Sequence, residues 1–163
     1  VTQLVFDGST VSIFSEREGV YLAIPATGGI DGALDEVRAV LGTEAAGGAD
    51  LLYSNPYDGL MFEAQSGEYL GKAWVNGVLA DHLSYRASEV DWQIWVRSGD
   101  QPIPVKYVIT SKWMAAAPEF SLSVSGFESA IETKSEDFTF VPPEGAREIT
   151  ADQLPEIDLL TEE

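Results

Sequence analysis

The stretch Val90–Trp113, VDWQIWVRSGDQPIPVKYVITSKW, decides the fold, because two runs of alternating apolar and polar residues flank a turn within it. The side chains that share the apolar face of the two runs are Val90, Trp92, Ile94, Val96, Val105, Tyr107 and Ile109. The other face is polar, apart from Trp95 and Val108. The stretch therefore predicts an antiparallel hairpin with one bulky face, and it contains no motif that names a reaction.

The segments on both sides of this hairpin alternate in the same way. GEYLGKAWVNGVLADHLSYR turns at Asn76-Gly77, the preferred dipeptide of a two-residue hairpin turn, and its large face places Trp74 opposite Leu79. EFSLSVSGF places on one face Phe120, Leu122 and Val124. Further strands are predicted in QLVFDGSTVSIFS, GVYLAIP and DFTFVPPEGAREI, the last stopped by Pro142-Pro143. The prediction is therefore a β protein of about nine strands.

Between the third and fourth predicted strands, the apolar period changes from that of a strand to that of a helix. IDGALDEVRAVLG predicts an amphipathic helix, with Asp31 suited to its N-cap and Gly42 to its C-cap. DLLYSNPYDGLMFEA predicts one or two short helices, the second capped by Asn55. The apolar residues that these helices are expected to turn toward the sheet include Leu34, Val37, Leu41 and Met61.

These elements predict an α+β fold that is mainly antiparallel β. We expect one curved, open half-barrel sheet of about nine strands, with the helices inserted between the third and fourth strands covering its concave face. With 163 residues, the chain has the length of one domain. In this prediction residues 1–149 form a single open-barrel domain, and residues 150–163 form an acidic C-terminal tail.

The charge and composition of the chain limit its partners. The formal net charge is −18 with only 9 Lys and Arg residues, so the surface repels nucleic acid and anionic membranes. No apolar run reaches the roughly 18 residues of a membrane span, so stable membrane insertion is not expected. Cysteine is absent, which excludes disulfides and thiolate metal sites. The chain opens directly into a strand without a signal peptide, so we expect a processed product that has lost its targeting segment.

Several motifs, taken in their order, resemble the periplasmic lipoprotein-carrier superfamily, and within it a bacterial group of predicted periplasmic proteins of unknown function. The resemblance covers about residues 3 to 149. The motifs that carry it are FDGSTVSIFS, IPA, LLYSNPY, GVLADHLSYR, VDWQIWVRSGDQPIPVKYVIT and FTFVPPEG. The superfamily usually begins with an N-terminal helix and early strands, which we expect to be missing from this chain.

This resemblance implies an unclosed β-barrel with a helical lid that holds acyl chains or another hydrophobic ligand, and it implies a periplasmic location. The implied ligand-binding lining falls on Trp92, Ile94, Tyr107, Ile109, Phe120, Leu122 and Val124. We add as expected ligand-binding residues Trp74 from the large face of the Asn-Gly hairpin, and Leu34, Val37, Leu41 and Met61 from the helices. The gating residues of the carrier match no position here, so lipoprotein transfer itself does not carry over.

Polar side chains occur without the spacing that catalysis or metal binding needs. His82 is the only histidine, so a site built from several histidines is excluded. The carboxylates form no calcium-loop motif, the serines form no G-x-S-x-G turn, and no phosphate-binding loop is present. We therefore expect neither an enzyme nor a protein with a metal or another cofactor.

The aromatic residues of the first hairpin each allow two interpretations. Trp92 and Tyr107 either pack in a filled core or line a cavity, depending on whether the helices fill the space. Trp95, on the polar face, either lies against the stem of Lys106 or Lys112, or marks a docking patch for a partner or for the missing N-terminal segment. Trp95 is accordingly the candidate partner-binding residue.

Three functions follow from these observations. The leading hypothesis is a non-enzymatic periplasmic protein that binds a lipid, an acyl chain or another hydrophobic small molecule in the concave side of the half-barrel. The alternative is a protein-interaction or sensor module on the same fold with a filled core, whose partner is an envelope protein. A hydrolase that uses paired carboxylates is a third and weaker hypothesis.

Overall fold

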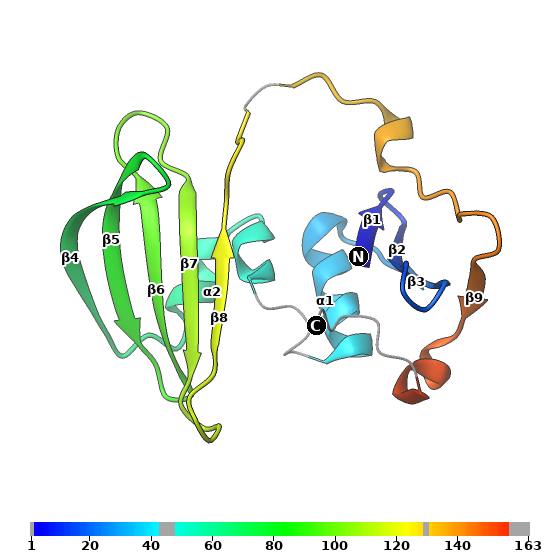
Figure 1. The fold of residues 1–163 in the computed structure, drawn as a ribbon, viewed down its shortest axis with the longest axis horizontal. Coiled ribbons are helices and arrows are strands. Elements are labelled where there is room, and N and C mark those ends of the chain that lie inside the picture. The colour runs from blue at the N-terminus through cyan, green and yellow to red at the C-terminus, as the bar shows by residue number, and fades with distance from the viewer. Residues whose placement is uncertain (1, 43–47, 129–130, 157–163) are drawn as a thin grey trace. The chain divides into compact units, whose positions relative to one another are not determined.

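The chain divides into two compact units in the computed structural model, which describes residues 2–42, 48–128 and 131–156 (Figure 1). Val1–Ser54 and Ile131–Glu163 together form one unit, here called the terminal unit. Asn55–Ala130 form the other, here called the tryptophan unit because all four tryptophans of the chain lie in it. The tryptophan unit is therefore an insertion between the two pieces of chain that build the terminal unit.

The terminal unit contains a four-stranded sheet in the order β1-β2-β3-β9. Its strands are β1 (Thr2–Phe6), β2 (Thr10–Ser15), β3 (Val20–Pro25) and β9 (Arg147–Ile149). The β1–β2 turn forms because the Asp7 carboxylate accepts the amide N–H groups of Ser9 and Thr10, each at 2.8 Å, beside Gly8 at φ 99°. β9 pairs with β3 in parallel, which brings the end of the chain back to its beginning.

Helix α1 (Gly29–Leu41) contacts β2 and β3 of this sheet and completes its core. Its C-cap is Gly42, as predicted, and the Gly42 amide donates to the carbonyl of Arg38 at 2.9 Å. The predicted N-cap was wrong, because the N-cap is Gly28 and Asp31 lies inside the first turn. The core cluster consists of Val11, Ile13, Val20, Leu22, Ile24, Ala26, Ala33, Val37 and Ile149, with Phe6, Val40, Leu41 and Leu154 packed against it.

The chain reaches the tryptophan unit through short helices and then forms a five-stranded meander in the order β4-β5-β6-β7-β8 (Figure 1). The helices are the 3-10 helix η2 (Ala49–Leu52), which still belongs to the terminal unit, and α2 (Pro56–Met61). The strands are β4 (Ser66–Val75), β5 (Val78–Arg86), β6 (Val90–Arg97), β7 (Pro104–Ser111) and β8 (Glu119–Ser123). Two predicted signals are confirmed. Asn55 caps α2, and Asn76-Gly77 forms the β4–β5 turn with φ angles of 49° and 81°.

The prediction of a single sheet was wrong, because the strands form two sheets. Nine strands lie in the described part of the chain, and helices follow the third strand and precede the fourth in the sequence. β3 has β2 on one edge and β9 on the other, so no edge remains to which β4 could add. The five-stranded sheet has β4 and β8 as its edges and is not a closed barrel. The protein is therefore mainly antiparallel β, with its strands in two sheets.

The last predicted strand, which was expected to stop at Pro142-Pro143, was placed wrongly. The 3-10 helix η3 (Ser135–Phe138) replaces its beginning, and Pro142-Pro143 cannot donate hydrogen bonds to a ladder, so pairing starts only at Arg147. Phe140 packs against Phe14 and Tyr21 with ring centroids 6.1 and 5.4 Å apart. Of the predicted acidic tail, the 3-10 helix η4 (Ala151–Glu156) is described, whereas residues 157–163 lie outside the described residues.

Candidate functional site

The five-stranded sheet carries one face of large apolar side chains, here called the apolar face. In an antiparallel sheet, residues directly opposite one another point to the same side. The pairing register gives two rows that cross all five strands on this side. The first row is Gly67, Tyr85, Trp92, Ile109 and Phe120, and the second is Tyr69, Leu83, Ile94, Tyr107 and Leu122. Six of the predicted ligand-binding residues therefore share one face, as expected from their alternation.

Aromatic rings hold the first row together. Tyr85 stacks on Trp92 with ring centroids 4.1 Å apart and planes inclined by 15°, and Tyr107 meets Trp92 edge-on at 6.0 Å. The Tyr85 ring also lies across Gly67, where an added Cβ would be 2.5 Å from the ring. The glycine is therefore required because the ring occupies the volume that a side chain would fill.

The exposure of the apolar face changes from its centre to its edges. Trp92, Ile94 and Tyr107 are 5%, 8% and 3% exposed, so the centre is covered. At the edges, Phe120 on β8 is 42% exposed and Tyr69 on β4 is 56% exposed. The face thus combines a packed centre with apolar side chains open to solvent at both edge strands.

A polar cluster lies beside the second row on the same face. The Asp81 carboxylate accepts a hydrogen bond from the Ser98 hydroxyl at 2.5 Å and another from the Tyr69 hydroxyl at 2.7 Å. The Lys72 ammonium lies 3.2 Å from the Ser98 hydroxyl oxygen and 3.8 Å from Asp81. Two hydrogen bonds lower the pKa of Asp81 below its ordinary value, and the bond from Ser98 has a larger effect than the bond from Tyr69. The hydrogen bond to Asp81 in turn raises the pKa of Tyr69.

The other predicted ligand-binding residues lie outside these two rows. Val37 and Leu41 pack in the core of the terminal unit, and Leu34 is buried on the same helix. In the tryptophan unit, Met61 is half-buried in α2, and Val124 is half-buried just after β8. Trp74, opposite Leu79, is on the apolar face near the end of β4 and is 72% exposed. Whether these residues contact a ligand stays a prediction.

The opposite face of the sheet, here called the polar face, surrounds Trp95. The Trp95 ring stacks on His82 with centroids 4.0 Å apart, and the Lys106 ammonium lies 4.9 Å from the Trp95 ring centroid. His82 also lies 2.9 Å from the side-chain oxygen of Gln93. The lysine contact corresponds to the first of the two interpretations of Trp95, and a role in partner binding stays a prediction.

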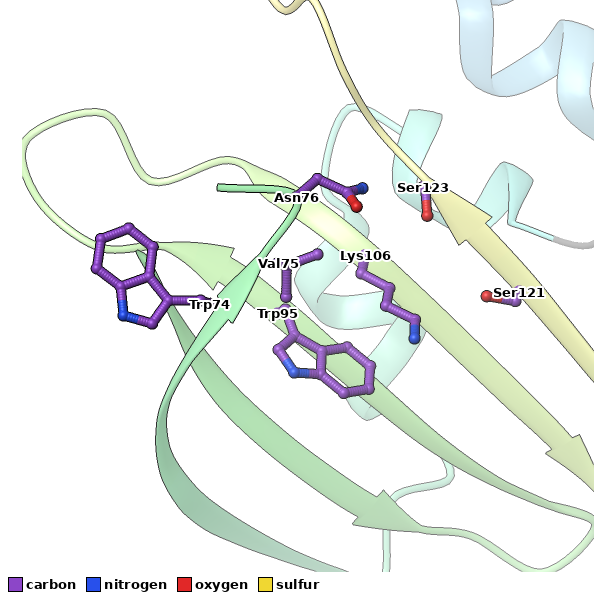
Figure 2. A pocket seen from close by; sticks show the side chains of 7 residues that line it. All are labelled: Trp74, Val75, Asn76, Trp95, Lys106, Ser121 and Ser123. Carbon is purple, nitrogen blue, oxygen red and sulfur yellow. The ribbon is translucent and has the colours of Figure 1, made fainter. Parts of the chain in front are cut away.

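A hollow of about 390 Å³ opens on the polar face, and Figure 2 shows its lining. The lining residues are Trp74, Val75, Asn76, Trp95, Lys106, Ser121 and Ser123. The Lys106 side chain lies between Trp95 on one side and the two serines on the other, and the Trp74 ring points away from them (Figure 2). The alternation of Ser121, Ser123, Trp95 and Lys106 in the sequence already placed all four on one face, but it did not predict a hollow there.

Tyr69 was missed as a residue of the apolar face because of a β-bulge. The two-residue turn at Asn76-Gly77 predicts Leu70 opposite Leu83, whereas the register shifts between Tyr69 and Gly71 and brings Tyr69 opposite Leu83. Gly71, at φ 99°, was the available signal, because an isolated glycine inside a strand often marks a bulge.

In the described part of the chain, no three His, Asp or Glu side chains are grouped to hold a metal ion.

The fold and these surfaces define a two-sheet, mainly antiparallel β protein whose five-stranded sheet has one face of large apolar side chains. The family model described as "Predicted periplasmic protein (DUF2092)" matches residues 1–151, so the chain belongs to this family. The predicted membership in a group of predicted periplasmic proteins is confirmed, and the family description agrees with the predicted location. The comparisons do not show the lipoprotein-carrier superfamily, since neither a curated protein nor a solved structure matches the chain. Among the described residues, no helix has the length and apolar character needed to cross a membrane.

Proposed function

We propose that this protein is a non-enzymatic binding protein of the periplasm that takes up a hydrophobic ligand, such as an acyl chain, on the apolar face of the tryptophan unit. The observation that carries the proposal is the pair of apolar rows across all five strands. A sheet in a soluble protein needs one apolar face for its core. Here, however, the apolar face continues to exposed aromatic residues on both edge strands, Tyr69 and Phe120.

Exposed apolar side chains elsewhere in the tryptophan unit support this proposal. Phe62, which follows α2, is 86% exposed, and Tyr57 within α2 is 67% exposed. A soluble protein that exposes several large apolar side chains in one region generally uses them for ligands or partners. The segment around α2 is therefore the candidate for the part that moves when the ligand enters.

The size of the hydrophobic effect sets the expected affinity. Burying about fifteen methylene groups contributes about 12 kcal/mol at about 0.8 kcal/mol each. Lost translational and rotational freedom costs at least about 4 kcal/mol, which leaves about 8 kcal/mol at most. The corresponding dissociation constant is about micromolar or weaker. Such affinity fits a carrier that must also release its ligand.

Native mass spectrometry and an uncharged fluorescent hydrophobe, N-phenyl-1-naphthylamine, test the proposal. We expect hydrophobic molecules to co-purify with the protein, and the delipidated protein to bind the probe saturably. Phe120→Ala should weaken probe binding about tenfold, which corresponds to about 1.4 kcal/mol of lost contact. Phe127→Ala removes an equally large side chain that is 51% exposed and outside the strands, and it should leave the affinity unchanged.

The buried centre of the apolar face favours the second candidate function, a protein-interaction or sensor module with a filled core. Trp92 and Tyr107 are already as buried as core residues without any ligand. The same experiment separates the two functions. A protein that carries no hydrophobic molecule and does not bind the probe after delipidation contradicts ligand uptake and supports the filled-core module.

A further inference from the structure

We infer that the hollow on the polar face is a second binding site, which takes a small organic carboxylate with an apolar body. Its volume of about 390 Å³ lies within the range of about 300–1,000 Å³ that is usual for small-molecule sites. All its lining residues belong to the tryptophan unit. The site is on the side of the sheet opposite the apolar face, so it is independent of the proposed hydrophobe binding.

Lys106 supplies the positive charge of this site. The other two lysines of the tryptophan unit, Lys72 and Lys112, lie 3.8 and 3.1 Å from the carboxylates of Asp81 and Asp91. Lys106 forms no ion pair in the described part of the chain, and its ammonium instead lies over the Trp95 ring. A ring face stabilises the charge but accepts no conventional hydrogen bond, so the ammonium keeps its donors for a ligand.

Uncharged hydrogen-bond donors surround the Lys106 side chain. Ser123 is directly opposite Lys106 in the β7–β8 register, and Ser121 is two residues away on the same face. No hydrogen bond of either hydroxyl is found within the described residues. Figure 2 shows both hydroxyls and the Asn76 amide around the Lys106 side chain. One ammonium with two hydroxyls and an amide can donate to both oxygens of a carboxylate.

The negative charge of the whole protein does not cancel this local field. The carboxylates that the register places on the polar face are those of Glu68, Asp91 and Glu119. Glu119 pairs with Thr110, four residues from Lys106, which is about 13 Å at about 3.3 Å per residue. Glu68 is three strands away, or about 14 Å at about 4.8 Å per strand. Both separations exceed the Debye length of about 8 Å at physiological salt. The third carboxylate, Asp91, is paired with Lys112 at 3.1 Å. The Lys106 charge therefore dominates the field that acts on a ligand in contact with it.

The apolar part of the lining selects the body of the ligand. Val75 and Trp95 form the side of the hollow that faces the Lys106 stem. An inorganic anion would leave Val75 and Trp95 in contact with water. An aromatic or aliphatic carboxylate covers these side chains while its oxygens accept hydrogen bonds from Lys106 and the serines. The site is therefore assigned to small aromatic or aliphatic acids rather than to inorganic phosphate.

Titrations followed by ¹H–¹⁵N NMR at the Trp95 indole N–H test the site, with benzoate, benzyl alcohol and inorganic phosphate as probes. We expect benzoate to shift this resonance saturably, and the uncharged benzyl alcohol and phosphate to bind at least tenfold more weakly. Lys106→Gln should weaken benzoate binding tenfold or more, and Lys106→Arg should retain it. Lys134→Gln makes the same charge change outside the tryptophan unit and should have no effect.

Three results would overturn the inference. Equal binding of benzyl alcohol and benzoate would indicate apolar adsorption without a charge contact. Phosphate binding as tight as benzoate binding would indicate an anion site without an apolar part. Wild-type affinity in Lys106→Gln would remove the lysine from the site. The probe of the apolar face carries no carboxylate, so this inference and the proposed function can fail separately.

Discussion

At the scale of single residues, the identity of Gly67 is explained by a contact on the neighbouring strand. Its backbone conformation demands no glycine, because its φ is not in the left-handed region. The constraint is instead the Tyr85 ring, which occupies the position of a Cβ and stacks on Trp92. Aromatic cover of a strand glycine in this way compensates for the packing that the glycine cannot supply.

Gly67→Ala should lower the free energy of unfolding by about 1–3 kcal/mol, because the new methyl group pushes the Tyr85 ring off Trp92. Urea unfolding followed by tryptophan fluorescence measures the change. Gly59→Ala is the matched control, since nothing lies within 4 Å of its added Cβ and alanine favours the helix α2. The control should be as stable as the wild type or more stable. A Gly67→Ala variant of wild-type stability would show that the ring relaxes freely.

At the scale of elements, Asp81 links three parts of the five-stranded sheet. It lies on β5 and accepts hydrogen bonds from Tyr69 on β4 and from Ser98 just after β6. These bonds favour the charged form, so the pKa of Asp81 in the folded protein lies below its ordinary value of 3.8. A depressed folded pKa contributes stability that is fully present above pH 3.8 and is lost as the pH falls through the folded value.

Asp81→Asn should therefore lose stability near neutral pH and show a smaller further loss in acid than the wild type. The quantity to compare is the difference in unfolding free energy between the two proteins from pH 6 to pH 2, because protonation also relieves the repulsion of a chain with net charge −18. This difference should shrink below about pH 4. Asp100→Asn, at an exposed position in the β6–β7 loop, controls for the loss of one charge. If the difference in unfolding free energy stayed constant from pH 6 to pH 2, the protonation of Asp81 would not be coupled to folding.

At the scale of the whole molecule, the two sheets depend on chain segments at very different separations. The five-stranded sheet is a meander of sequential neighbours, whereas the four-stranded sheet needs β9 to return to β3. Ile149 on β9 is 2% exposed and packs with Val11 and Leu22, and the hydroxyl of Tyr21 donates to Glu148 at 3.3 Å. The terminal unit therefore closes only after the whole tryptophan unit has been passed in the chain.

Ile149→Ala should destabilise the terminal unit by about 2–5 kcal/mol, because it leaves a cavity in a filled core. Hydrogen exchange of the β2 and β3 amides reports this loss directly, and these amides should exchange much faster than in the wild type. Ile131→Ala makes the same change at a position that is 63% exposed and should leave the protection intact. Equal protection in the two variants would mean that β9 contributes little to this core.

The sequence by itself determined the first eight strands, the side to which most of their side chains point, the Asn76-Gly77 turn, and the insertion of helices between the third and fourth strands. These features follow from alternation and turn chemistry over a few neighbouring residues, so they can be read locally. The shared face of Trp92, Ile94 and Tyr107 is one result of this kind.

Only the tertiary structure decided how the strands divide into two sheets, how β9 pairs in parallel with β3, and which residues meet around Trp95 and Gly67. Each of these features depends on contacts between segments that are distant in sequence, or on a bulge that shifts the register by one residue. Local patterns carry no information on which edge of β3 is occupied. They also cannot show that the rings of His82 and Tyr85 lie against tryptophans of the next strand, because ring packing depends on the complete set of neighbours.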